Sequence, residues 1–373
     1  MKKVAFIIES NAVGGAERVL RDLVKYIDSS KFDVTVVSLF KNSVYGGTSQ
    51  FADSFSCKYR WVIDNGDSTK AKVGSFLISR FPNLFYQLFI RTKYDVLVAF
   101  YEGMPTTFVS SLCTSSKKVA WLHTSVDMSI PVRKESVLKA KFNIYSSFDR
   151  IVGVSNGVRN GFVALFPSLT DKVFTAYNPV DSLRIRTLSS ESQDIPISDK
   201  FTFVAVGRII PCKGYERLIN VAQKLKEDGL DFVVWIIGGG GGHVRLMKLA
   251  KEKGVEERFV FYGNRSNPYV YMKKANCVIS SSYIEGLSIV LIEGLVLGKL
   301  IVATNSIGPE EIIGKNSEWG LLVDNSEGGL YEGMKKVLQN QRFTKEYEQK
   351  AILRAQYFDV NHTIEVIEKM LIN

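Results

Sequence analysis

The chain has 373 residues, of which 46% are hydrophobic and 23% are charged, and its net charge is +10. This composition excludes a disordered protein, and the length suits two globular domains better than one. No apolar run reaches the roughly 18 residues that a membrane-spanning helix needs. The apolar run near the N-terminus ends at Glu9, after five residues. We interpret that run as a first buried strand.

Short runs of β-branched and aromatic residues alternate with amphipathic stretches along the whole chain. The predicted strands cover residues 4–8, 34–39, 95–100, 119–122 and 151–154 in the first half, and 202–206, 232–237, 259–262, 277–281 and 300–304 in the second. Helical spacing lies between them, for example over 17–27 and 214–226. This alternation predicts an α/β fold with two Rossmann-like, doubly wound domains. Residues 181–200, rich in Ser and Asp, are expected to link them.

The positive charge is concentrated in the first half of the chain. Residues 1–185 hold 24 Lys and Arg against 15 Asp and Glu, whereas the remainder is nearly balanced. A basic half predicts an acidic partner, such as an anionic membrane surface or a phosphate-bearing acceptor. A basic surface without any partner is the alternative. The four cysteines are far apart and form no CxxC pair, which favours reduced thiols and a cytoplasmic location.

Two loops that follow predicted strands combine glycines with cations. In doubly wound sheets, ligands bind at such loops, beyond the carboxyl ends of the strands. Gly14 and Gly15 follow strand 4–8 and would let a helix start approach a ligand closely, although a tight turn needs the same residues. Arg208 and Lys213 follow strand 202–206, and two cations beside a helix start could neutralise a diphosphate. Solvated surface cations would give the same pattern.

Five glycines at 238–242 follow strand 232–237. They do not complete a GxGxxG pattern, because His243 stands where the last glycine belongs. No GxxxxGK[ST] sequence occurs either, so the dinucleotide-binding and P-loop fingerprints are both absent. The run predicts a backbone that bends beside a ligand or a facing domain.

Glu285 and Glu293 bracket the loop and helix start that follow strand 277–281. A helix is expected to begin near Ser288, which is a favourable N-cap residue. The backbone amides of residues 286–289 would then lie at the positive end of the helix, between the two carboxylates. A carboxylate there would be repelled by a diphosphate but stabilised by sugar or ribose hydroxyls. Two solvated surface glutamates are the alternative interpretation.

The pattern resembles the retaining glycosyltransferases of the GT-B fold, closest to the GT4-like (group 1) family. Glu285 and Glu293, with seven residues between them, match its EX7E signature. The other matching segments, in chain order, are Gly14-Gly15-Ala16-Glu17, Tyr177-Asn178-Pro179-Val180-Asp181, Gly207-Arg208 with Lys213-Gly214, Gly298-Lys299 with Val302-Ala303-Thr304, and Gly308-Pro309-Glu310-Glu311.

The resemblance implies a donor site formed mainly by the second domain. Its members would be Glu285, Gly286 and Leu287 at the donor sugar, Glu293 at the ribose, Arg208, Lys213, Gly14, Gly15 and the amides of Leu287, Ser288 and Ile289 at the diphosphate, and Tyr262, Gly263, Asn264 and Arg265 near the base. His123 follows strand 119–122 and matches the family's histidine near the donor sugar, so it joins Glu285 as a catalytic residue. A lone histidine is otherwise usually structural.

The expected function is retaining transfer of a sugar from a nucleotide-diphosphate sugar, with a UDP-sugar as the expected donor, to a glycan or lipid-linked acceptor in cell-surface polysaccharide biosynthesis. No Asp-x-Asp pair occurs, so neither a metal nor a cofactor is expected, and cations and helix amides would bear the leaving-group charge. The alternative is a catalytically silent sugar-nucleotide-binding or membrane scaffold protein of the same fold. No interleaved aromatic and basic motif predicts nucleic-acid binding.

The resemblance also sets the domain boundaries. We expect an acceptor-binding domain at 1–182, a nucleotide-sugar-binding domain at 183–358 and a C-terminal helix at 359–373. In similar transferases the two domains face a cleft, and this helix crosses back to the first domain.

Residues 73–92 have apolar side chains close to helical spacing, with Lys70, Lys72, Arg80, Arg91 and Lys93 around them. Pro82 is expected to divide the segment into two shorter helices. Such a segment predicts peripheral contact with the inner face of the cell membrane, unless its apolar face packs inside the first domain.

Overall fold

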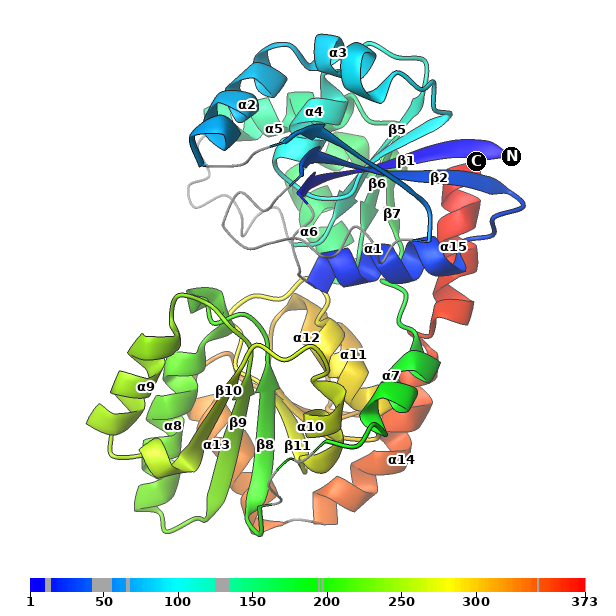
Figure 1. Cartoon of the computed structure of the whole chain (residues 1–373). Coiled ribbons are helices and arrows are strands. Elements are labelled where there is room, and N and C mark those ends of the chain that lie inside the picture. The colour runs from blue at the N-terminus through cyan, green and yellow to red at the C-terminus, as the bar shows by residue number, and fades with distance from the viewer. Residues whose placement is uncertain are drawn as a thin grey trace. The chain divides into compact units, whose positions relative to one another are not determined.

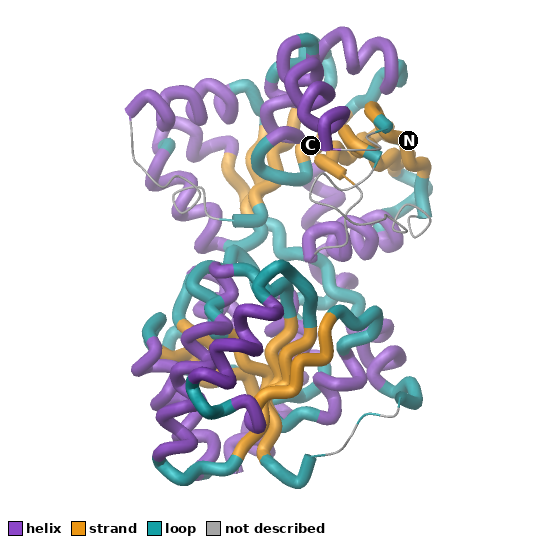
Figure 2. Tube along the Cα trace, turned by 60° about the vertical axis from the view of Figure 1, so that its left-hand side comes forward, coloured by secondary structure: helices purple, strands orange, loops and turns teal. Residues whose placement is uncertain are grey.

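The computed structural model describes residues 1–10, 15–41, 56–64, 68–124, 135–193, 195, 198–340 and 342–372 (Figure 1). The chain divides into two compact units, one formed by Met1–Pro179 with Val360–Asn373 and one by Val180–Asp359. The boundaries expected from the sequence lie within a few residues of these. Each unit holds one parallel sheet with helices on both of its faces (Figure 2).

The first unit is built on a seven-stranded sheet of order β3-β2-β1-β4-β5-β6-β7. Its strands are β1 (Lys2–Ser10), β2 (Phe32–Phe40), β3 (Lys58–Ile63), β4 (Val96–Ala99), β5 (Lys117–Leu122), β6 (Arg150–Gly153) and β7 (Val173–Thr175). Residues 4–8 of β1 are fully buried, as expected for a central strand with helices on both faces. The strand order reverses between β1 and β4, so the loops after these two strands open at a topological switch point.

The helices of the first unit connect these strands. They are α1 (Gly15–Tyr26), α2 (Ser68–Arg80), α3 (Pro82–Phe85), the π-helical turn η2 (Tyr86–Ile90), α4 (Met104–Ser110), α5 (Glu135–Ser146), α6 (Asn156–Leu165), the 3-10 turn η3 (Pro167–Lys172) and α15 (Val360–Ile372). The expected division of the segment at Pro82 is confirmed, because α2 ends at Arg80 and Pro82 opens α3.

The last helix, α15, is part of the first unit although it is far from the rest of that unit in sequence. The Glu368 carboxylate accepts a hydrogen bond from the Asp28 backbone N–H at 2.8 Å and lies 3.3 Å from Lys31 Nζ. Arg150 Nη1 donates to the carbonyl of Met370 at 2.8 Å. These contacts join α15 to the loop between α1 and β2 and to the start of β6.

The second unit is built on a six-stranded sheet of order β10-β9-β8-β11-β12-β13. Its strands are β8 (Phe201–Val206), β9 (Phe232–Ile237), β10 (Phe259–Gly263), β11 (Cys277–Ser280), β12 (Leu300–Thr304) and β13 (Leu321–Val323). Its helices are α7 (Ser182–Ser189), α8 (Tyr215–Glu227), α9 (His243–Glu252), α10 (Tyr269–Lys274), α11 (Ile289–Val296), α12 (Ile307–Ile313), α13 (Glu327–Gln339) and α14 (Arg342–Gln356), with 3-10 turns η4 (Pro211–Lys213) and η5 (Glu256–Arg258). The strand order reverses between β8 and β11, which places a second switch point there.

The expectation that residues 181–200 form a linker is wrong for the first half of that segment. Asp181 caps α7 by accepting from the Arg184 N–H at 2.8 Å, and α7 contacts α10 and α11 within the second unit. The Ser- and Asp-rich composition reflects a helix cap and a short, largely polar helix rather than an extended connection.

No helix in the described part of the chain is both long enough and apolar enough to cross a bilayer.

Candidate active site

The candidate site of the second unit lies where β8 and β11 end, at the switch point of its sheet. Because all strands run parallel, the loops after β8, β9, β10, β11 and β12 meet at one edge of the sheet. The sequence-predicted residues of this unit sit on these loops or on the helices that follow them: Arg208 and Lys213 after β8, residues 238–242 after β9, Tyr262 to Arg265 at β10, and Glu285 to Glu293 after β11.

Two glycines allow these loops to pack backbone against backbone. Gly214 has φ +65°, and a Cβ there would lie 2.1 Å from the carbonyl oxygen of Ser281. Gly238 has φ +151°, and a Cβ there would lie 1.9 Å from the carbonyl oxygen of Gly207. Both positions therefore require glycine, which explains part of the glycine run by contact between loops rather than by contact with a ligand.

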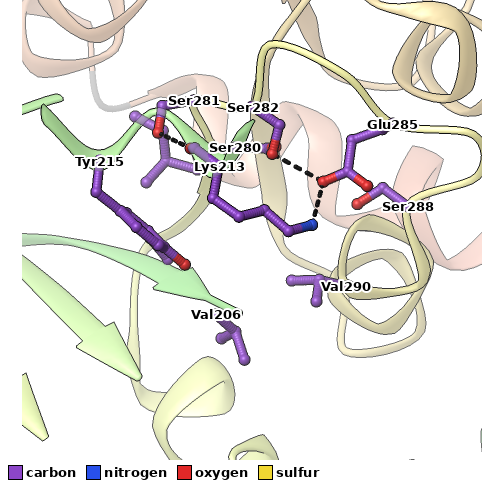
Figure 3. Close-up of a pocket in the computed structure, with 11 residues that line it drawn as sticks. Val206, Lys213, Tyr215, Ser280, Ser281, Ser282, Glu285, Ser288 and Val290 are labelled. Carbon is purple, nitrogen blue, oxygen red and sulfur yellow. Dashed lines mark hydrogen bonds and ion pairs between the residues drawn. The ribbon is translucent and has the colours of Figure 1, made fainter. Parts of the chain in front are cut away.

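Lys213 and Glu285 form the polar centre of a pocket at this switch point (Figure 3). Lys213 Nζ lies 2.5 Å from Glu285 Oε1, and Ser282 Oγ donates to the same carboxylate oxygen at 2.7 Å. The side chains of Lys213 and Glu285 are 25% and 12% exposed, so both can be reached from the pocket. The pocket is lined by Ala205, Val206, Lys213, Tyr215, Ile279, Ser280, Ser281, Ser282, Glu285, Ser288 and Val290.

The start of α11 adds backbone donors beside Glu285. Ser288 occupies the N-cap position, but its hydroxyl makes no capping hydrogen bond. Among the described residues, no acceptor is found for the backbone amides of Leu287, Ser288 and Ile289. These amides stand at the positive end of a helix, where an anionic oxygen is stabilised.

Glu293 lies on α11 and is not among the residues that line this pocket. Its side chain is 3% exposed, and Glu293 Oε1 accepts a hydrogen bond from Tyr269 Oη at 2.8 Å. The structure therefore brings Glu285 and Lys213 together but places Glu293 one layer deeper, against α10. Burial of a carboxylate is costly without such a partner.

Arg208 and the base-region residues occupy neighbouring loops. Arg208 is exposed directly after β8, and within the described residues its guanidinium forms no ion pair. The Arg265 guanidinium lies 6.0 Å from the centre of the Tyr262 ring, which in turn packs on Tyr271 at 4.6 Å between ring centres. Tyr262 and Arg265 thus present an aromatic face and a cation beyond β10.

Sequence reasoning missed Arg217, which holds the Glu285 loop in place. Arg217 lies on α8 and is 1% exposed. Its guanidinium donates to the carbonyl oxygens of Ser281 and Ser282 at 2.7 and 2.8 Å, to Asn325 Oδ1 at 2.8 Å and to Thr304 Oγ1 at 3.0 Å. It also lies 3.9 Å from the centre of the Tyr283 ring. The only sequence signal was an arginine at an inward position of an amphipathic helix, four residues after Lys213.

His123 directly follows β5 in the first unit, as expected. Its ring lies 4.8 Å from the Phe100 ring and 5.5 Å from the Tyr101 ring, between ring centres. Burial lowers the pKa of His123 to about 4, and a hydrogen bond to the Phe100 backbone offsets this only in part. The imidazole is therefore neutral at pH 7, and its buried Nε2 has no hydrogen-bond partner among the described residues.

Glu102 follows β4, next to the strand that precedes His123. Its carboxylate accepts from the Thr124 backbone N–H at 2.7 Å, and burial raises its pKa. Gly15 is the first residue of α1, whereas Gly14 lies outside the described residues. In the ranges that the structure covers, no group of His, Cys, Asp and Glu has the arrangement of a metal site.

Comparison with known proteins places the chain in a family. The model of the group 1 glycosyl transferases matches residues 189–354, and that of Glycosyltransferase Family 4 matches residues 13–184. The N-acetylgalactosamine-N,N'-diacetylbacillosaminyl-diphospho-undecaprenol 4-alpha-N-acetylgalactosaminyltransferase of Campylobacter jejuni is 30% identical over 373 residues, covering 96% of each chain.

Solved structures show the same fold. Anabaena HepE in complex with UDP-glucose superimposes with a TM-score of 0.79 at 18% identity, covering 100% of this chain and 99% of the other. WaaG, a glycosyltransferase involved in lipopolysaccharide biosynthesis, superimposes with a TM-score of 0.70 at 15% identity, covering 99% and 100%. The two parallel-sheet units are those of the GT-B class. The chain belongs to the group 1 glycosyltransferases and is itself a glycosyltransferase.

Proposed function

We propose that this glycosyltransferase moves a sugar from a UDP-sugar to a glycan or lipid-linked acceptor with retention of configuration, without a metal ion, in cell-surface polysaccharide biosynthesis. The observation that carries the proposal is the contact between Lys213 and Glu285 beside the uncapped start of α11. A cation, a carboxylate and unpaired backbone amides at one switch point suit a ligand that has a diphosphate at one end and hydroxyls at the other.

The proposed donor contacts follow from the charges of the groups. Lys213, Arg208 and the amides of residues 287–289 stabilise the diphosphate, whose negative charge grows as it leaves. Glu285 accepts hydrogen bonds from donor-sugar hydroxyls once a phosphate oxygen has taken its place beside Lys213. Glu293 accepts from the ribose, which requires its carboxylate to exchange or share the Tyr269 hydroxyl. Tyr262 and Arg265 are proposed for the base, and His123 is the proposed catalytic histidine of the first unit.

The proposed reaction exchanges one bond for another at the anomeric carbon. The bond from this carbon to the β-phosphate oxygen breaks, and a bond to the acceptor hydroxyl oxygen forms on the same face of the sugar. The acceptor proton moves to the departing phosphate oxygen, so no protein base is consumed. Support for a UDP-sugar comes from the HepE complex with UDP-glucose, and support for a lipid-linked acceptor from the name of the Campylobacter jejuni relative.

The test has two stages. Nucleotides and nucleotide sugars of uracil, guanine and adenine are screened by thermal unfolding, since a ligand that binds the native state raises the unfolding midpoint. UDP and one UDP-sugar should give the largest shifts. The transfer product is then isolated and its anomeric configuration determined by NMR. A product with the anomeric configuration opposite to that of the donor would overturn the retaining mechanism, and binding without donor turnover would favour the silent scaffold.

A further inference from the structure

An unusually apolar surface covers α2, α3 and η2 of the first unit. We call it the α2–η2 face, and it consists of Val73, Phe76, Leu77, Phe81, Leu84, Leu88 and Phe89. Phe76 is 68% exposed, Val73 54% and Leu84 50%, and the other four side chains are 37–47% exposed. Figure 1 shows α2 and α3 following one another at one end of the first unit. The alternative that this segment buries its apolar residues inside the domain is therefore wrong.

The inner side of α2 explains why the larger residues remain outside. Ala71, Gly74 and Ile78 are buried at helical spacing. A Cβ at Gly74 would lie 2.7 Å from Ile63 Cδ1 of β3 and 3.1 Å from Phe40 Cε1 of β2, so the helix backbone packs directly on the sheet edge. The small residues thus anchor α2, and its large apolar residues point the other way.

The α3–η2 segment is likewise held to the rest of the unit by only a few contacts. The Asn83 side chain bonds to the Cys113 N–H at 2.7 Å and to the Ser111 carbonyl at 3.3 Å. Tyr86 Oη donates to the Thr92 carbonyl at 3.1 Å, and Ile90 is 1% exposed. The rings of Phe85 and Phe89 stack at 5.4 Å between centres. A few polar and apolar anchors therefore hold the segment, while Leu84, Leu88 and Phe89 remain exposed.

The charge of the segment has one sign. From residue 68 to residue 94 the sequence contains no Asp or Glu, and it contains five cations at Lys70, Lys72, Arg80, Arg91 and Lys93. All five are exposed, and the Arg80 guanidinium lies 5.5 Å from the centre of the Phe81 ring. Large apolar side chains with cations at both ends of the segment and no acid between them match the chemistry of an anionic lipid bilayer surface.

From this geometry we infer that the α2–η2 face is a membrane-docking surface, which inserts its phenylalanines and leucines among the acyl chains while its cations pair with anionic headgroups. A second protein chain is a weaker candidate, because a protein interface usually carries charges of both signs. The inference goes beyond the proposed sugar transfer, since it concerns a surface of the first unit that holds none of the residues proposed for the donor. If the acceptor is lipid-linked, as proposed above, docking would also bring the enzyme to its substrate.

The experiment measures co-flotation of the full chain with two kinds of vesicle, phosphatidylcholine alone and phosphatidylcholine mixed with phosphatidylglycerol, at low and high salt. Binding is expected only to the anionic vesicles, and it should weaken as salt screens the lysines and arginines. Phe76→Ser with Leu84→Ser should reduce the vesicle partition coefficient on the order of 100-fold, because two large side chains no longer insert. Lys70→Gln with Lys72→Gln should reduce it about tenfold or more.

The matched control is Leu183→Ser with Leu353→Ser, which removes two leucines of the second unit that are 75% and 59% exposed. It should bind vesicles like the wild type. All variants should unfold at wild-type temperature, because every substituted residue is exposed. No flotation of the wild type at low salt would overturn the inference. So would a wild-type dimer in light scattering that Phe76→Ser with Leu84→Ser makes monomeric, since the face would then bind a second copy. Neither result depends on donor turnover.

Discussion

At the scale of single residues, the contact between Lys213 and Glu285 sets the electrostatics of the proposed donor site. The two side chains neutralise each other at 2.5 Å when no ligand is bound. In the proposed mechanism a diphosphate competes with Glu285 for Lys213, and Glu285 then becomes available to the donor sugar. The ion pair offsets the free-energy cost of desolvating the two charged groups, because neither charge is left unpaired in a partly buried pocket.

Replacing Lys213 by methionine is expected to weaken UDP-sugar binding by roughly 10- to 150-fold, since one charge-assisted contact to phosphate is worth about 1.5–3 kcal/mol. Calorimetry of the variant with the donor found in the nucleotide screen measures this. Lys248→Met serves as the control, because Lys248 is 77% exposed on α9 and pairs only loosely with Glu252 at 3.6 Å. Equal donor affinities in the two variants would show that Lys213 does not bind the donor.

His123 predicts a pH dependence of stability. The pKa of an unfolded histidine is 6.5, and burial lowers that of folded His123 to about 4. Between these values the unfolded chain binds a proton that the folded protein excludes, so the free energy of unfolding falls as the pH decreases from 6.5 to 4. The loss attributable to this group is up to about 2–3 kcal/mol.

Urea unfolding of wild type and of His123→Asn across this pH range isolates the contribution. The free energy of unfolding of the wild type minus that of the variant should fall by up to about 2–3 kcal/mol as the pH decreases from 6.5 to 4. At pH values higher than about 6.5 this difference should be constant. Parallel curves over the whole range would show that the histidine titrates normally in the folded protein.

The site residues that could be predicted from sequence are those that follow strands in short motifs. Lys213 and Glu285 were found in this way, because loop and helix-start chemistry is local. Arg217 and Tyr269 were not, because their roles arise from contacts with segments 64 and 24 residues away. The pairing of Lys213 with Glu285 could not be predicted either, because neither motif indicates that the β8 and β11 loops are neighbours.

At the scale of elements, α8 does more than cover the sheet, since it delivers Arg217 to the loop after β11. Four acceptors from the β11 loop, β12 and the β13 loop converge on that one guanidinium. Thr304 Oγ1 also donates to the Ser282 carbonyl at 2.6 Å, and Asn325 Nδ2 to the Tyr283 carbonyl at 2.9 Å. The loop that ends in Glu285 is therefore fixed by neighbours on three elements.

We expect Arg217→Met to lower the free energy of unfolding by about 3–5 kcal/mol, because several buried carbonyl and hydroxyl groups lose their donor at once. Donor affinity should fall as well, since Glu285 and Lys213 are no longer held in register. Urea unfolding and calorimetry measure the two effects. Arg245→Met is the control, because Arg245 is 65% exposed. A variant with normal stability and normal affinity would contradict the positioning role.

Element prediction succeeded for the buried strands, including the four-residue strands β4, β6 and β11, and failed for three strands at the sheet edges. The strands β1, β2, β8 and β9 were predicted from their continuous apolar runs. The edge strand β3, with its mixed pattern Lys-Tyr-Arg-Trp-Val-Ile, and the three-residue strands β7 and β13 were missed. Their pairing comes from the neighbouring strand rather than from their own propensity.

At the scale of the whole molecule, the proposed chemistry relies on charges that the chain itself supplies. The sequence has no Asp-x-Asp pair, whereas Lys213, Arg208 and the start of α11 offer positive groups. Transfer should therefore continue undiminished in EDTA. The assay is donor turnover before and after chelation, with Mg²⁺ or Mn²⁺ added back. Activity that disappears in EDTA and returns with either ion would contradict the prediction.

The first unit combines two distant parts of the chain, because α15 follows the whole of the second unit. During synthesis the ribosome releases β1 to β7 first, then the continuous second unit, and only afterwards α15. Domains generally fold as they emerge from the ribosome, but the first unit cannot be completed until α15 has been synthesised. Until then the surface of α1 that receives α15 stays exposed, and Glu368 cannot reach the Asp28 N–H. The second unit is thus complete before the first one is.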